Sequence, residues 1–95
     1  MEDMKTAKQM ERHLKGMANH HRIGILFTTA EQPGIILDDI ARTLGANRKT
    51  IGEHTRRLHV AGLIDKKYRG HAVEHRLSPY GKMFVRFLKS FRTTP

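Results

Sequence analysis

The apolar residues of this chain recur at helical spacing in five separate segments. The first segment predicts one apolar stripe on a helix over about residues 4–18, formed by Met4, Ala7, Met10, Leu14 and Met17. A second short helix stops before Gln32-Pro33-Gly34, and Ile35-Ile36 predicts a brief extended piece. The closing segment predicts a helix over about residues 79–91, which starts with Ser78-Pro79 as N-cap and first helical position.

Two helices in the middle of the chain are joined by a tight turn. The first has the i, i+3, i+4, i+7 spacing of an amphipathic helix, at Leu37, Ile40, Ala41 and Leu44. Gly45 suits the C-terminal cap of this helix, and Asn47 suits the N-cap of the next one. The buried stripe of that second helix consists of Ile51, Thr55 and Leu58. The sequence therefore predicts a helix-turn-helix over about residues 37–60.

A β-hairpin is predicted over about residues 63–77, with its turn at Arg69-Gly70-His71. The complete order is helix, helix, helix-turn-helix, hairpin, helix. This is the order of a winged helix-turn-helix, a mainly α fold with a small β-hairpin, and we expect residues 1–95 to form one such domain.

Positive charge is concentrated in the second half of the chain. Residues 1–46 carry six Lys or Arg and six acidic residues, whereas residues 47–76 carry eight Lys or Arg against three acids. The last nineteen residues add four more basic residues and no acid, which completes the net charge of +9. This asymmetry favours a polyanionic partner, and we expect double-stranded DNA. Four residues at or near the hairpin tip could then lie along the DNA backbone: Lys66, Lys67, Arg69 and His71.

Two segments resemble transcription regulators of the ArsR (arsenical-resistance repressor) type. The segments are MANHHRIGIL, residues 17–26, and the stretch from LDDIARTLGANRKTIGEHTRRLHVAGLID to HRLSP, residues 37–79. The start of the last helix, LSPYG, is similar to that of MarR- and PadR-type regulators. The resemblance covers about residues 14–79 and implies that residues 47–57 form the DNA-recognition helix.

The resemblance also implies a role for each residue of this helix. Beyond Asn47, the residues expected to face bases are Arg48, Lys49, Thr50 and Glu53, and those expected to face phosphates are Arg56 and Arg57. Glu53 departs from the Arg or His common in the family; it either accepts from a cytosine amino group or, as we favour, pairs with Arg57 one turn later. His54 is expected to be half-buried against the predicted β-hairpin, which is the wing of this fold. Gly52 permits two interpretations, a close approach to DNA or a tolerated surface glycine.

Metal sensing, common among ArsR-type proteins, is not expected here. The thiolate pair of their helix-turn-helix site would fall near Ile36 and Asp38, and the chain has no cysteine. The last helix contains no Asp, His or Glu between Tyr80 and Phe91. We therefore predict no metal site and no cofactor, and we identify no effector.

The apolar stripes of the first and last helices exceed what one thin domain can bury, which predicts a homodimer. The expected interface residues are Met4, Met10, Leu14, Tyr80, Phe84, Phe87, Leu88 and Phe91. A two-fold dimer would present two recognition helices to a pseudo-palindromic operator.

Other classes of function fit the sequence less well. No glycine-rich loop follows a strand and no nucleophile–base order is evident, so we expect no catalytic residues and no enzyme. No apolar run approaches bilayer length and no secretory segment is recognisable, so we expect a soluble cytoplasmic protein without a membrane partner. The function predicted is a sequence-specific DNA-binding regulator acting as a homodimeric repressor. The alternatives are a winged-helix protein-interaction module, an architectural DNA-coating protein and, less favoured, an RNA-binding winged helix.

Overall fold

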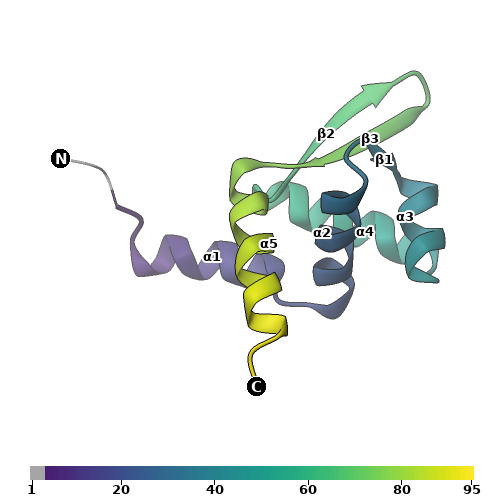
Figure 1. The fold of residues 1–95 in the computed structure, drawn as a ribbon. Helices are drawn as coiled ribbons and strands as arrows, with labels where there is room; N and C mark the ends of the chain where they lie inside the picture. The colour runs from purple at the N-terminus through teal and green to yellow at the C-terminus, as the bar shows by residue number, and fades with distance from the viewer. Residues whose placement is uncertain (1–3) are drawn as a thin grey trace.

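The computed structural model describes residues 4–95, which form five helices and one three-stranded antiparallel sheet (Figure 1). The helices are α1 Ala7–Met17, α2 His20–Glu31, α3 Leu37–Leu44, α4 Arg48–Val60 and α5 Pro79–Arg92. The strands are β1 Ile35–Ile36, β2 Ile64–Arg69 and β3 Ala72–Leu77. This order confirms the expected winged helix-turn-helix, with the helix-turn-helix at Leu37–Val60.

Local capping signals fix the helix boundaries. Asn47 caps α4, Ser78 caps α5 with Pro79 at its first position, and Gly45 ends α3 in the left-handed region at φ 62°. The first helix begins later than expected because Thr6 forms a capping box with Gln9. Met4 therefore lies outside α1, and its predicted place in the helical stripe is wrong.

The wing is part of a three-stranded sheet, whereas the sequence predicted a hairpin and, separately, a brief extended piece at Ile35-Ile36. Strands β2 and β3 pair as expected, from Ile64 opposite Leu77 to Arg69 opposite Ala72. The short strand β1 pairs with the other edge of β3, giving the order β1-β3-β2. Two residues of β1 are enough to cover part of that edge and to connect the wing to the start of α3.

A core of aliphatic side chains lies between α2, α3, α4 and the base of the sheet. Its fully buried members are Ile25, Leu26, Ile40, Ile51, Leu58, Leu63 and Ile64. Leu88 of α5 joins this core and is only 6% exposed. The prediction that Leu88 belongs to a dimer interface is therefore wrong, because this side of α5 faces the domain itself.

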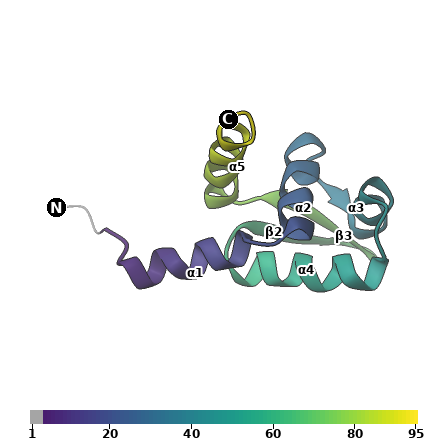
Figure 2. The same cartoon turned by 90° about the horizontal axis from the view of Figure 1, so that it is seen from below.

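Helices α1 and α5 lie at one end of the molecule, away from α3 and the wing tip (Figures 1 and 2). In Figure 2, α1 continues the line of α4 along one edge of the molecule. Among residues 4–95, no helix is long and apolar enough to cross a membrane.

Candidate nucleic-acid interface

Helix α4 presents a polar face to solvent because its apolar stripe is buried. Ile51, Thr55 and Leu58 point into the core, as their spacing predicts. The oxygen of the Asn47 side chain accepts hydrogen bonds from the backbone N–H groups of Lys49, at 2.7 Å, and Thr50, at 3.3 Å. The side chain of Asn47 therefore stabilises the helix start, in addition to any contact it makes with a partner.

Glu53 lies among the basic residues of α4 and binds two of them. Its carboxylate accepts from Arg56 at 2.7 and 3.1 Å and from Arg57 at 3.1 Å. The hydrogen bond with Arg56, together with the one from Arg57 and both positive charges, lowers the pKa of Glu53 to about 2. The favoured interpretation of Glu53 as helix support has the geometry it needs, with Arg56 as an additional partner.

The remaining cations of α4 differ in whether an acidic residue pairs with them. Arg48 forms an ion pair with Asp38 of α3, which connects the two helices of the helix-turn-helix. Lys49 is exposed and, within the described part of the chain, forms no ion pair. Within residues 4–95, the charge of Lys49 is therefore not offset by an acidic neighbour.

The wing residues predicted to contact DNA divide between two faces. Lys67, Arg69 and His71 are exposed, and Arg69 lies 3.3 Å from Glu74 across the hairpin. Lys66 is not at the tip: it is half-buried beside His75, and this burial, with the charge of Arg56, lowers its pKa.

Sequence reasoning also missed Tyr68, whose ring is 76% exposed on the wing. Strand alternation along β2 is a signal that could have found it, since Tyr68 shares its face with Lys66.

A cleft of about 340 Å³ separates α4 from the wing. Its walls include Arg48, Gly52 and Thr55 of α4 together with Lys66 and Tyr68 of the wing. A Cβ atom added to Gly52 would lie 3.6 Å from Leu37, an ordinary contact. The domain itself therefore does not require glycine at position 52, and both interpretations of this residue stand.

Two histidines, His54 of α4 and His75 of β3, are wholly or partly buried. His75 of β3 is 2% exposed and its Nδ1 lies 3.0 Å from the carbonyl oxygen of Ile35; desolvation lowers its pKa. His54 is half-buried, but it stacks on His21 of α2 at 5.0 Å rather than on the wing as predicted. Desolvation, followed by the charge of Arg22, lowers the pKa of His54. Across residues 4–95, no three His, Asp or Glu side chains are arranged to hold a metal ion.

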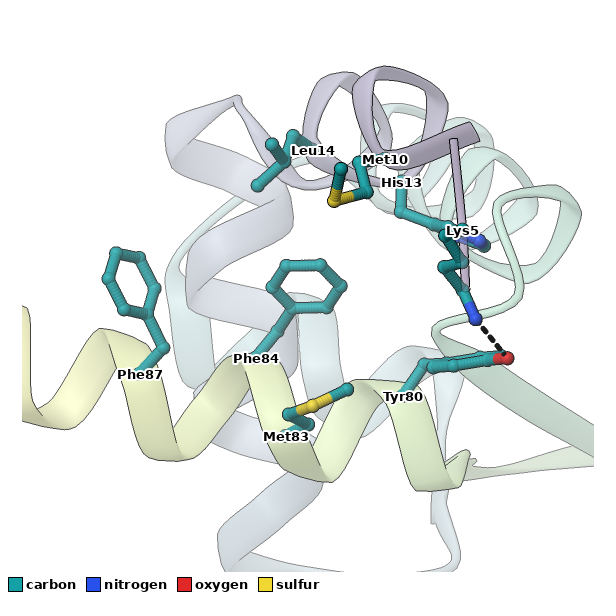
Figure 3. A pocket seen from close by; sticks show the side chains of 8 residues that line it. All are labelled: Lys5, Met10, His13, Leu14, Tyr80, Met83, Phe84 and Phe87. Atoms are coloured by element: carbon teal, nitrogen blue, oxygen red, sulfur yellow. Dashed lines mark hydrogen bonds between the residues drawn. The ribbon is translucent and has the colours of Figure 1, made fainter. Parts of the chain in front are cut away.

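A second surface, between α1 and α5, is apolar. Figure 3 shows a cavity of about 340 Å³ with side chains of α1 on one side and of α5 on the other, lined by Lys5, Met10, His13, Leu14, Tyr80, Met83, Phe84 and Phe87. Phe87 and Phe91 stack at 5.7 Å and are 53% and 64% exposed. Lys5 donates a hydrogen bond to the Tyr80 hydroxyl at 2.7 Å. The apolar surplus predicted for the terminal helices is present, and Met83 adds to it.

Comparison with solved structures finds the same architecture. HlyU from Vibrio cholerae N16961 has a TM-score of 0.84 at 20% identity, over 97% of this chain and 100% of that chain. The homodimeric winged helix-turn-helix DNA-binding domain of a possible ArsR-family regulator from Mycobacterium bovis has a TM-score of 0.78 at 22% identity. The match covers 97% of this chain and 91% of that chain. NolR from Sinorhizobium fredii has a TM-score of 0.82 at 16% identity, and the match covers 100% of both chains.

No family model matches the chain, and no curated protein matches it. At identities of 16–22% the structural likeness establishes the winged helix-turn-helix fold, in agreement with the expected resemblance to ArsR-type proteins.

Proposed function

We propose that this protein is a transcription regulator that binds double-stranded DNA through α4 and the wing. The observation that carries the proposal is a capped helix whose exposed side bears Lys49, Arg56 and Arg57, next to a hairpin bearing Lys67 and Arg69. An α-helix of this kind fits the major groove, where Lys and Arg donate to guanine, and a basic hairpin fits the adjacent backbone. The solved proteins with this fold include DNA-binding regulators, which supports the proposal.

The proposal includes a homodimer formed through the α1–α5 surface. The cavity between Met10 and Leu14 on one side and Phe84 and Phe87 on the other is open to solvent, and apolar surface of this kind usually marks an interface. The Mycobacterium bovis domain is homodimeric, which supports the same state here. Two-fold symmetry would place the recognition helices about 34 Å apart, one helical turn of DNA, on a pseudo-palindromic operator.

Repression is the mode of regulation that we propose. A dimer seated on a promoter excludes polymerase by occupancy, with no further contact required. One structural neighbour, AntR, is an antimony-specific transcriptional repressor with a TM-score of 0.79.

Fluorescence anisotropy tests the proposal directly. The protein is titrated at several salt concentrations against DNA from upstream of its own gene and against a shuffled duplex of equal length. Binding at least ~10³-fold tighter to the upstream DNA would demonstrate sequence-specific recognition. Equal affinity with steep salt dependence would instead indicate a charge-driven DNA-coating protein. Lack of binding to either duplex at low salt would contradict the proposal and favour a protein-interaction module.

A further inference from the structure

A second basic surface lies beside the second half of α4, and none of its lining residues belongs to the wing. It is a depression of about 380 Å³ where the end of α1, the start of α2 and the second half of α4 meet. Five cationic side chains line it: Arg12, Lys15, Arg22, Arg56 and Arg57. We call it the basic groove. Arg12, Lys15 and Arg22 belong to the electrically neutral first half of the sequence, so charge counting along the chain gave them no role.

The groove is formed because α1 packs closely against the end of α4. A Cβ atom on Gly16 would lie 2.4 Å from the Cβ of Ala61, a distance that only glycine allows without a shift. One turn earlier in α1, Nδ1 of His13 lies 2.9 Å from the carbonyl oxygen of Ala61. These two contacts fix the direction of α1 and place Arg12 and Lys15 beside Arg56 and Arg57.

The cations of the groove exceed the acids that could neutralise them. Glu53 is shared by Arg56 and Arg57, and Glu11 lies 3.7 Å from Lys15. Among residues 4–95, Arg12 and Arg22 form no ion pair, and the buried Nε of Arg22 has no hydrogen-bond partner. Five cations against two carboxylates repel one another, so an anion from outside the chain would stabilise this surface.

We propose that the basic groove binds backbone phosphates of the same duplex that α4 reads, through cations of α1 and α2 together with those of α4. This inference rests on the proposed function. In Figure 2, α1 and α4 lie along one edge, so a duplex placed on the exposed side of α4 continues past the end of α1. Backbone phosphate is the expected occupant because five Arg and Lys side chains line the groove and most protein–DNA hydrogen bonds go to the backbone. The backbone contacts of the recognition helix are then supplied by α1 and α2 as well as by the wing.

A charge-matched pair of variants provides the first test. Arg12→Gln/Lys15→Gln removes two exposed positive charges from the groove, and Lys82→Gln/Lys89→Gln removes two exposed charges from α5. Both are titrated, with the unchanged protein, against a mixed-sequence 30-bp duplex at several salt concentrations. We expect the log–log salt slope of the groove variant to fall by about 0.9 for each phosphate that is no longer neutralised, up to about 3.6 for four phosphates in a dimer. The α5 variant should keep the original slope.

The outcomes separate this inference from the proposed function. If the unchanged protein binds and both variants lose slope equally, net charge alone is responsible and the groove assignment is wrong. If the groove variant keeps the original slope, the assignment is also wrong, while DNA binding stands. If the unchanged protein does not bind, the proposed function and this inference fail together. Saturable binding of inorganic phosphate alone below about 1 mM, lost in the groove variant, would assign the groove to a free anion instead.

A second measurement uses the absence of cysteine from the chain. Lys15→Cys, Lys49→Cys and Lys82→Cys each create one thiol that can carry an iron chelate for local hydroxyl-radical cleavage of bound DNA. We expect cuts from position 49 and, displaced along the backbone, from position 15, with none from position 82. Cleavage from position 49 without cleavage from position 15 would overturn the groove assignment and leave the role of α4 intact.

Discussion

Two surfaces of this small domain differ in character: the surface of α4 and the wing is positively charged, and the surface between α1 and α5 is apolar. Around α4 and the wing the surface carries a surplus of positive charge, only partly neutralised by Asp38, Glu53 and Glu74. Between α1 and α5 the surface carries a surplus of apolar side chains, with Phe87 and Phe91 more than half exposed. Like charges repel and exposed apolar surface is unfavourable in water, so a polyanion would stabilise the first surface and an apolar partner the second.

Helix α1 contributes side chains to both the apolar and the basic surface. Its Met10 and Leu14 face α5 across the apolar cavity, while Arg12 and Lys15 line the basic groove. Its position depends on the contact of Gly16 with Ala61, so any movement of α1 alters both surfaces together. The comparison shows how a domain of this size could connect self-association with nucleic-acid binding through one helix.

The largest effect is expected at the apolar end. Phe87→Glu places a carboxylate in the proposed interface, where burial of an unpaired charge is costly. Because Phe87 is half exposed within one protomer, the fold should persist while the dissociation constant of the dimer rises by about 100-fold or more. Sedimentation velocity over a concentration series measures this change, with Lys89→Glu as the control. A dimer of unchanged strength would show that the interface lies elsewhere.

The attachment of α5 can be tested at Gly81. A Cβ atom there would lie 2.1 Å from the backbone oxygen of Leu63, which cannot move without disturbing the start of β2. We expect Gly81→Ala to lower the free energy of unfolding by about 1–3 kcal/mol. Gly52→Ala is the matched control: its Cβ meets only an ordinary contact, so it should be neutral or stabilising by up to about 1 kcal/mol. Urea denaturation compares the two, and equal effects would contradict the close approach. DNA affinity of Gly52→Ala also distinguishes the two interpretations of that glycine.

At the charged end, Glu53→Gln should strengthen binding to a mixed-sequence duplex. The change frees Arg56 and Arg57 from their shared carboxylate and removes one negative charge from the surface facing DNA. We expect tighter binding and a salt slope steeper by about 0.9 for each additional phosphate that these arginines neutralise, with the fold retained because the group is exposed. Glu31→Gln at the exposed end of α2 removes the same charge away from both basic surfaces and is the control. Weaker binding to every duplex would show that Glu53 holds the arginines in their binding geometry, and weaker binding to one sequence would show that it reads a base.

The smallest effect expected is a loss of stability in mild acid. Burial lowers the pKa of His75 and of His54 below the ordinary value of 6.5, so the unfolded chain takes up protons at these residues more readily than the folded one. The free energy of unfolding should therefore decrease as the pH falls below about 6.5. His75→Asn keeps a donor near the position of Nδ1 for the Ile35 carbonyl but does not titrate, so its loss of stability from about pH 7.5 to about pH 5.5 should be smaller. Parallel pH profiles for the variant and the original protein would contradict this assignment.

The elements of the fold could be predicted because their signals are local. Apolar spacing and the caps Gly45, Asn47 and Ser78 act over a few residues, and the bounds of the helix-turn-helix followed from them. The same is true of the hairpin, whose turn contains Gly70 at φ 61°. The roles assigned to individual residues of α4 and the wing remain predictions, because they concern a partner outside the chain.

Contacts between distant segments could not be predicted in this way. Periodicity placed Leu88 on an apolar stripe but did not show which part of a wide stripe turns toward α2 and the core. The resemblance implied that His54 is half-buried, but not that His21 covers it. Two residues of β1 carry too little pattern to reveal their pairing with β3.

The amino-acid sequence by itself therefore determined which segments become helices and strands, and that charge and apolar surface would each be in excess. Only the tertiary structure decided where on the surface the excess positive charge and the excess apolar side chains are located. Arg12 and Arg57 are far apart in the chain and come together because Gly16 lets α1 approach the end of α4. The reason is physical: helix formation depends on neighbours within a turn or two, whereas a groove depends on how closely whole helices can pack.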